Sequence, residues 1–290
     1  MATRPLSIPA SMSKKVRFTS TLVRRFVITG VLIYIALVLL SPMLGLLIEA
    51  WRVGFAKVFA AVATEAGFEA LQMSLILVII SVVVNAVVGT LGAIALVRHR
   101  FWARNLISVL CDLPLAVSPV MIGLAFLLLV GRDGTFAPML QALGIKIVFS
   151  FPGIVLGTLF VTLPYTVREV AYVLDEIGTS EEEAAMTLGA SVLQTFFLVT
   201  LPNIRLALGY GLLMTSARAL GEFGAVLVLG GSITGHTQTA TTFIHDAIEE
   251  RQLAEAYGMA LVLALFSVVL LLGLEWSKKR KHLIGNKAKL

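Results

Sequence analysis

The chain has 290 residues, of which 58% are hydrophobic and 14% are charged, and its mean hydropathy is +0.94. Soluble domains usually carry about a quarter charged residues, so this composition excludes an ordinary soluble protein and indicates an all-α chain that crosses a membrane several times. The net charge of +6 does not indicate a nucleic-acid partner, because the cations are concentrated near the two ends of the chain. Cys111 is the only cysteine, which excludes an intrachain disulfide and a multi-cysteine metal site.

The first part of the chain predicts a tail, a span and a connection. Residues 1–25 are polar and basic, as expected of a cytosolic tail. Residues 26–48 contain no charge over 23 positions, which is enough to cross about 30 Å of hydrocarbon. A signal peptide is the alternative, but its apolar core should be only about 7–15 residues long. We therefore predict that this span is retained and that the mixed segment 49–70 is an extracytoplasmic amphipathic connection.

The third predicted span is interrupted. Residues 71–97 form an uncharged second span, and the third, 106–130, contains Asp112, Ser118 and Pro119. A proline within a span removes a backbone donor and frees a carbonyl, which is tolerated where protein or water compensates. Because discontinuous helices often mark ion paths, Ser118 and Pro119 are pore candidates, with a packing kink as the alternative. Asp112 is interpreted as a helix-cap or interface residue.

A loop (131–150) and a fourth uncharged span (151–167) lead to a polar internal stretch, residues 179–202. Ser180 followed three residues later by Glu183 predicts a capping box that starts a short helix. Three glutamates occupy the first turn of this helix, where the positive end of the helix dipole favours them. The sequence therefore predicts a short surface helix between two spans.

This helix is predicted to be followed by a bend and a second short helix. Gly189 permits the bend, and Pro202 is expected to stop the second helix. A spacing of four residues is expected to place Leu188, Val192 and Phe196 on one face. From spacing alone, an ordinary amphipathic helix at the membrane surface is as compatible with the pattern as a functional one.

The fifth predicted span, 206–229, contains a pair of opposite charges, Arg218 and Glu222. An unpaired charge near the bilayer centre costs roughly 2.5–3.5 kcal/mol on insertion scales, and a spacing of four residues lets these two meet on one helix face. Gly221 and Gly224 interleave with them and allow close approach of another helix or a hydrated path. Two interpretations stay open: an ion pair that only fixes packing, or a pair that lines the passage, where Arg218 attracts an anion and Glu222 keeps its binding weak.

The polar stretch 230–255 is interpreted as an outer connection, followed by a sixth span over 257–274. It contains His236 and His245, which lack a third ligand at metal spacing, so we predict surface positions for both, or contact with a binding protein.

The polar stretch carries a resemblance. E-A-A at Glu183–Ala185, followed by Gly189 and by L-P at Leu201–Pro202, resembles the coupling-helix (EAA) motif of ATP-binding-cassette (ABC) importer permeases. In that family the loop docks into a groove on a separate cytosolic ATPase and carries its closure to the membrane helices. The resemblance implies that the contact to the ATPase is made by Glu182, Glu183, Ala184, Ala185, Leu188 and Gly189.

Three further blocks extend the resemblance. A-R-A-L-G-E-F-G-A-V at 217–226, L-P-N-I-R at 201–205 and D-L-P-L-A-V-S-P-V at 112–120 are together similar to the sulfate/molybdate branch of type I importer permeases. With G-H-T at 235–237, the chain is most similar to W-type subunits of sulfate/thiosulfate importers. The resemblance implies six transmembrane helices in a type I (MetI-like) permease fold. It also implies a homologous T-type permease, two ATPase subunits and an extracytoplasmic sulfate-binding protein as partners, besides membrane lipid.

The charge distribution predicts the orientation in the membrane. With six spans and both termini in the cytosol, 17 of the 23 Lys and Arg residues lie on the inner side, 5 lie on the outer side, and Arg218 lies within the bilayer. Cations favour the cytosolic side, so we predict this orientation in the bacterial cytoplasmic membrane. The predicted parts are a cytosolic tail (1–25), a permease domain (26–276) with a coupling-helix loop (176–202), and a basic cytosolic tail (277–290).

The sequence predicts no catalytic residue, cofactor or metal in this chain. G-x-x-x-x-G-K-[ST] does not occur, so ATP and Mg are expected on the partner ATPase subunits. A molybdate or tungstate permease of the same architecture is the main alternative to a sulfate or thiosulfate permease. An ion-coupled secondary transporter is less favoured, and so is an intramembrane hydrolase built on Glu182 and Glu183, because all four histidines lie outside the predicted spans.

Overall fold

The computed structural model describes residues 10–287, with side chains described for residues 23–60 and 62–273. Regular structure within these residues is entirely helical, as the composition predicts. Five helical runs are long and apolar enough to cross a membrane, and a sixth crossing is counted if one bent pair of helices forms a single span. The chain divides into two compact units, residues 1–54 and 55–290.

The first unit contains one long helix, α1 (Ala10–Val53). It includes the uncharged run 26–48, and its apolar part, Val23–Val53, is long enough to cross a bilayer. The predicted cytosolic tail overlaps this helix from residue 10 onward, and residues 1–9 lie outside the described residues.

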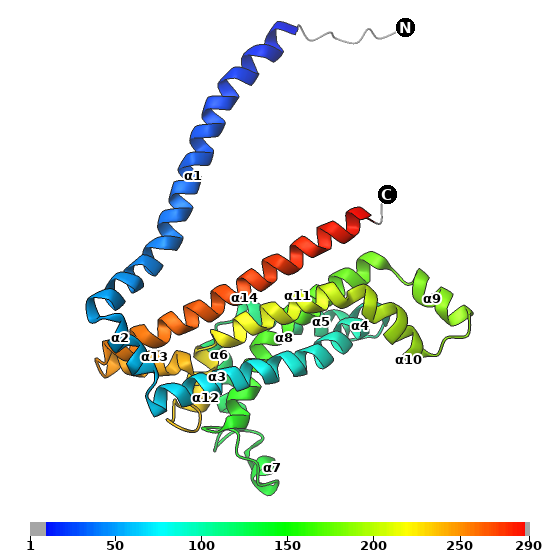
Figure 1. Ribbon diagram of the computed structural model, residues 1–290. Helices are drawn as coiled ribbons and strands as arrows, with labels where there is room; N and C mark the ends of the chain where they lie inside the picture. The colour runs from blue at the N-terminus through cyan, green and yellow to red at the C-terminus, as the bar shows by residue number, and fades with distance from the viewer. Residues whose placement is uncertain (1–9, 288–290) are drawn as a thin grey trace, which may run out of the picture. The chain divides into compact units, whose positions relative to one another are not determined.

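The second unit is built around three long helical runs that pack against one another (Figure 1). The first consists of α3, a π-helical turn η1 and α4; the second is α8; the third consists of α10, a π-helical turn η2 and α11. Two more helices, α2 and α14, pack against each other, and α14 also contacts α11 and α13. Their bounds are α2 (Phe55–Val62), α3 (Glu65–Val84), η1 (Asn85–Gly89), α4 (Thr90–Arg98), α8 (Phe151–Ile177), α10 (Val192–Thr195), η2 (Phe196–Thr200), α11 (Leu201–Leu220) and α14 (Leu253–Lys287).

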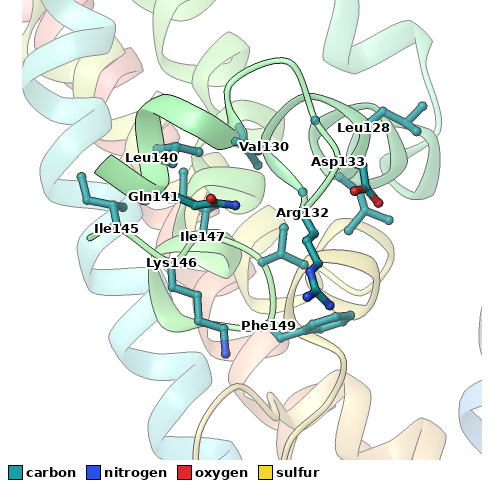
Figure 2. Close-up of a pocket in the computed structure, with 15 residues that line it drawn as sticks. Leu128, Val130, Arg132, Asp133, Leu140, Gln141, Ile145, Lys146, Ile147 and Phe149 are labelled. Carbon is teal, nitrogen blue, oxygen red and sulfur yellow. The ribbon is translucent and has the colours of Figure 1, made fainter. Parts of the chain in front are cut away.

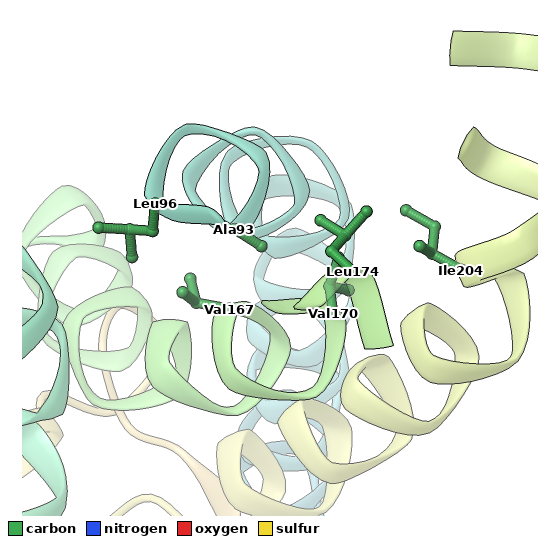
Figure 3. Close-up of a cluster of buried hydrophobic side chains, with 6 residues drawn as sticks. All are labelled: Ala93, Leu96, Val167, Val170, Leu174 and Ile204. Carbon is green, nitrogen blue, oxygen red and sulfur yellow. The ribbon is translucent and has the colours of Figure 1, made fainter. Parts of the chain in front are cut away.

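An apolar core joins the three runs close to the C-terminal end of α8. Its buried side chains come from α4, α8 and α11 (Figure 3). Because the side chain at position 93 is only a methyl group, α4 can lie close to α8 at this point. The core therefore fixes the place where the chain leaves α8 and enters the predicted coupling loop. Its members are Ala93, Leu96, Val167, Val170, Leu174 and Ile204.

Two helix breaks lie next to each other against α8. The helices α5 (Arg104–Ala116) and α6 (Pro119–Val130) are bent by 118° relative to each other, which confirms the predicted interruption at Ser118 and Pro119. The second break separates α11 from α12 (Gly224–Gly230). The short α12 packs against α6 and α8, so the discontinuous stretches lie side by side.

Two glycines allow this close packing. A Cβ atom on Gly224 would lie 2.9 Å from the backbone nitrogen of Val120, and one on Gly123 would lie 2.9 Å from Cβ of Val228. Both distances are far shorter than an ordinary van der Waals contact, so any larger residue would force α6 and α12 apart. This role agrees with the prediction that Gly224 allows another helix to come close.

The prediction that Pro202 stops a helix is wrong. The chain is helical from Val192 through η2 into α11, and Pro202 lies in the first turn of α11. In η2 the N–H group of Leu201 bonds to the carbonyl of Phe196, five residues earlier. This wider turn shifts the hydrogen-bond pattern just before the proline, and at the start of α11 its missing N–H is tolerated.

The stretch 230–255, interpreted as an outer connection, contains a helix and several buried residues. His236 is exposed, as predicted, but His245 is only partly exposed and lies in a helix, α13 (Ala240–Glu249), and Thr239 and Thr242 are buried. The N–H group of Ala240 donates to Oγ of Ser74 on α3 over 2.8 Å. This bond joins the first residue of α13 to α3. The connection 131–150 likewise contains a short helix, α7 (Ala137–Ala142).

We expect Gly224→Ala to lower the stability of the protein by about 1–3 kcal/mol, because the added methyl group meets backbone that cannot move freely. The matched control is Gly209→Ala, at an exposed position of α11 where an added Cβ has no neighbour within 4 Å. Thermal unfolding of the purified chain in detergent measures both. Equal apparent Tm values for the two variants would show that α6 and α12 are not closely packed.

Candidate functional site

The predicted coupling loop consists of two short helices that project from the end of α8. The first, α9 (Ser180–Thr187), follows Gly178, whose φ of +67° ends α8. The second is α10, which continues into η2 and α11. We call residues 178–195 the α9–α10 segment; Figure 1 shows it at the opposite end of α8 from α7.

The predicted capping box at Ser180 is wrong. Thr179 is the N-cap residue of α9, and its Oγ1 donates to the carboxylate of Glu183 over 2.6 Å. The predicted Glu-rich first turn is confirmed, with Glu181, Glu182 and Glu183 in it. A capping box does occur one helix later, where Ser191 and Gln194 exchange bonds of 3.3 and 2.8 Å at the start of α10.

Gly189 makes the bend between the two helices, as predicted. Its φ is +92°, a conformation that side-chain-bearing residues rarely adopt. The N–H group of Gly189 bonds to the carbonyl of Met186, and that of Ala190 bonds to the carbonyl of Ala185. This is the Schellman pattern, which satisfies the free carbonyls at a helix end. The backbone therefore defines the angle at which α10 leaves α9.

Arg98 anchors the α9–α10 segment to the bundle. It is the last residue of α4, and its guanidinium donates to the carbonyls of Leu174 over 3.0 Å and Gly178 over 2.7 Å, at the end of α8. Its Nε also lies 2.9 Å from Oε2 of Glu182, with 12% of the arginine side chain and 15% of the glutamate side chain exposed. A cation at the C-terminal end of a helix is favoured by the helix dipole, and a shielded ion pair is screened less than an exposed one. One side chain thus connects α4, α8 and α9.

Two of the three glutamates connect α9 to the chain that returns into the bundle. Oγ1 of Thr200 donates to Glu182 over 2.8 Å, and the amide of Asn203 donates to Glu181 over 2.5 Å. Glu183, by contrast, is exposed, and among the described side chains it bonds only within its own helix. The inward-facing glutamate of this segment is therefore Glu182.

The outer side of the segment is apolar. Leu188, Val192 and Leu193 have exposed fractions of 89%, 78% and 70%. Ala184 is exposed and Ala185 is partly exposed, which leaves a small-residue face on α9. The predicted common face of Leu188, Val192 and Phe196 forms only for Val192 and Phe196, which line one groove, because Gly189 redirects the chain between Leu188 and Val192. Phe196 is partly buried and lines a groove of about 330 Å³ between the segment and α4.

The second predicted site lies at the break between α11 and α12. Arg218 and Glu222 form the predicted ion pair, with Nη1 and Oε2 2.7 Å apart. Glu222 is 2% exposed, and its Oε1 accepts from the N–H group of Ala225 over 2.9 Å, at the start of α12. Oγ1 of Thr241 donates to the carbonyl of Glu222 over 2.7 Å. Glu222 therefore holds the break together, while 26% of the Arg218 side chain remains accessible.

The structure brings the other pore candidates to the same place. Gly224 lies against the backbone of Pro119 and Val120, so the break at Ser118 and Pro119 adjoins the break at Gly221. Ser118 and Gly221 are exposed and Pro119 is partly exposed. Asp112, predicted as a cap or interface residue, forms an ion pair with Arg168 over 2.5 Å and so connects α5 to α8.

Sequence reasoning missed the role of Arg98. In the sequence it is one of several cations that follow a span, and its partners lie 76 to 84 positions later. Its place at a helix C-terminus is the only local signal. The buried pair in which the Asn85 amide donates to Thr162 over 2.8 Å, between η1 and α8, was missed for the same reason.

Comparisons with known proteins agree with these features. Residues 88–280 match the family described as "Binding-protein-dependent transport system inner membrane component". The "Sulfate transport system permease protein CysW" of Synechocystis sp. is 44% identical over 249 residues, which cover 86% of this chain and 90% of that protein. "Sulfate permease 2, chloroplastic" of Chlamydomonas reinhardtii is 44% identical over 247 residues; these cover 85% of this chain but only 66%, just under two thirds, of that protein.

A solved structure shares the fold. It is described as a bacterial alginate ABC transporter in complex with an alginate pentasaccharide-bound periplasmic protein, and it aligns with a TM-score of 0.71 at 18% sequence identity. The alignment covers 93% of this chain and 97% of that chain.

We expect Arg98→Gln to loosen the α9–α10 segment, because it leaves the shielded carboxylate of Glu182 without its cation and frees two carbonyls at the end of α8. Amide hydrogen exchange over residues 179–189 should rise by about tenfold or more, since a lost shielded ion pair changes local opening by more than about 1.4 kcal/mol. Arg100→Gln, at an exposed cation two positions later, is the matched control.

The double variant Arg98→Gln/Glu182→Gln tests the charge itself. Because it removes the unpaired carboxylate, part of the protection should return. Unchanged exchange in Arg98→Gln would show that the segment is held by other contacts.

Proposed function

The chain belongs to the family of binding-protein-dependent transport system inner membrane components, and we propose that it is the W-type permease subunit of an ATP-driven sulfate or thiosulfate importer. It forms half of the translocation path in the bacterial cytoplasmic membrane, beside a homologous T-type permease. Two ATPase subunits, which bind ATP and Mg, and an extracytoplasmic sulfate-binding protein complete the assembly. The chain is a permease subunit and not an enzyme by itself.

The observation that carries the coupling part of the proposal is the α9–α10 segment. Its inner side is fixed to α4 and α8 through Arg98 and Glu182, and its outer side presents Leu188, Val192 and Leu193 to a partner. Exposed apolar side chains on a rigid element are suited to bury against a groove in another protein. A displacement of this segment would move the end of α8, to which it is joined, and would also move α11, to which it is joined through η2. The segment is therefore suited to receive motion from an ATPase.

The anion is proposed from the relatives and from charge. The relatives named above are a sulfate transport system permease protein and a sulfate permease, and Arg218 is an accessible cation at the meeting point of two helix breaks. Sulfate and molybdate are both tetrahedral dianions, so one cation in a path can hardly separate them. Selectivity is then expected in the binding protein, and a molybdate or tungstate importer is the alternative.

We expect this chain to restore growth on sulfate as sole sulfur source in a bacterial strain that lacks its own W-type permease. Val192→Asp should abolish both growth and co-purification of the ATPase, because it places a charge in the apolar contact. The control is Leu143→Asp, at a residue just after α7 that is 63% exposed; it should leave ATPase co-purification intact. Normal ATPase binding by Val192→Asp would contradict the coupling role, and rescue of molybdate-dependent growth alone would favour the alternative.

We expect Arg218→Gln to reduce sulfate uptake by the assembled complex by about tenfold or more, since it removes a cation from a low-dielectric path. The double variant Arg218→Gln/Glu222→Gln separates the two interpretations of the pair. If the pair only fixes packing, neutralising both members restores uptake; if Arg218 attracts the anion, uptake stays low. Uptake of radiolabelled sulfate into vesicles measures all three proteins.

A further inference from the structure

A cavity of about 690 Å³ lies at the end of the bundle opposite to the α9–α10 segment. It is enclosed by the C-terminal end of α6, by α7 and by the residues that lead into α8 (Figure 2). Its volume lies within the range of about 300–1,000 Å³ that is usual for pockets holding a small ligand. The proposed function makes no use of it.

The wall of this cavity is apolar. It is formed mainly by aliphatic side chains, with an amide, a carboxylate and two cations among them. A small hydrated anion gains nothing from such a wall, because it needs hydrogen-bond donors around it. A molecule with a long apolar part fits the wall much better. The main aliphatic residues are Leu127, Leu128, Val130, Leu140, Ile145 and Ile147.

The cations Arg132 and Lys146 are placed where a membrane meets water. No charged residue occurs between Asp112 and Arg132, or between Lys146 and Arg168. Each cation therefore closes a long apolar run, which is where cationic side chains reach the headgroup region. These positions put both cations at the expected depth of lipid headgroups, next to the apolar helix ends that line the cavity.

Neither cation is neutralised by the protein. Within the part of the chain with described side chains, Arg132, Lys146 and Asp133 make no ion pair, and all three are exposed. In Figure 2 the side chains of Arg132 and Lys146 extend to the same side of the cavity, and the carboxylate of Asp133 lies apart from their ends. With two cations and one carboxylate, the lining has a net charge of +1. Its charge complements an anionic headgroup.

We propose that this cavity is a binding site for an anionic phospholipid. An acyl chain lies along the aliphatic wall, and the phosphate interacts with Arg132 and Lys146. The site does not depend on which anion the chain transports.

The bound lipid would act on α12. The N–H group of Phe149 donates to the carbonyl of Leu229 over 2.7 Å, and Gly231 lies so close to the Phe149 ring that a Cβ atom there would be 2.7 Å from Cδ1. Phe149, in one wall of the cavity, is thus bonded to the C-terminal end of α12. The N-terminal end of α12 lies close to Glu222. Filling the cavity therefore stabilises the helix that adjoins the break.

The test is a titration of the purified full-length chain in detergent with phosphatidylglycerol and phosphatidylcholine of identical acyl chains, followed by native mass spectrometry. The wild type should bind phosphatidylglycerol more tightly. Arg132→Gln/Lys146→Gln should weaken phosphatidylglycerol binding by roughly 10-fold to 30-fold, the effect of two headgroup-level cations, with little change for phosphatidylcholine. The charge-matched control is Arg100→Gln/Arg104→Gln, which removes one cation from the loop after α4 and one from the first residue of α5.

A second variant tests the place of the acyl chain. Leu140→Trp fills the cavity and keeps both cations, so it should weaken binding of both lipids while the apparent Tm of the lipid-free chain stays the same. The proposal fails if the wild type binds both lipids equally, or if the Arg132→Gln/Lys146→Gln variant loses no more affinity than the control. It also fails if Leu140→Trp binds phosphatidylglycerol normally, which would place the chain elsewhere, or if millimolar inorganic phosphate displaces the lipid, which would indicate a bare anion site.

Discussion

The shielded guanidinium of Arg98 is the interaction on which the arrangement of the candidate coupling site depends. Where α8 ends, its last carbonyls have no partner within the helix, and the chain must turn back toward the bundle. Arg98 satisfies two of these carbonyls and a carboxylate of the next helix at once. A planar group with five donors can do this, whereas the compact ammonium of a lysine cannot. Without it, α9 would be joined to α8 only through Gly178 and Thr179.

The position of this interaction determines what a push on α9 can move. The α9–α10 segment is fixed to α4 and α8 by Arg98 and continues into α11 without a loop. Helices transmit displacement well along their axes, but both neighbouring runs contain a π-helical turn, η1 and η2. Such turns often mark functional sites. At η1, Asn85 bonds to Thr162 and Gly89 lies against Thr166. A conformational change in this turn would therefore alter contacts with α8.

Much of the fold follows from local properties of the sequence, and the part that does not depends on distant partners. Long apolar runs predicted the helical spans, and Gly189 predicted the bend because few other residues adopt its φ of +92°. The helix start was misplaced by one residue, since the φ of Gly178 decides where α9 begins. Pro202 was wrongly predicted to end a helix because a π-helical turn precedes it, and no local sequence pattern predicts such a turn. The contacts of Arg98 span more than 70 positions, so a single sequence could not reveal them.

The two ends of α11 differ in a way that suits a transporter. At its first turn, Asn203 bonds to Glu181 and Ile204 lies in the apolar core, so this end follows α8 and α9. At its last turn, the helix stops at a break held by Glu222, with Arg218 partly open and the α5–α6 break beside it. The distance between the ends is about 30 Å for 20 residues, comparable to the thickness of a membrane core. A displacement at the end next to the α9–α10 segment would therefore arrive at a place where the helices are already interrupted.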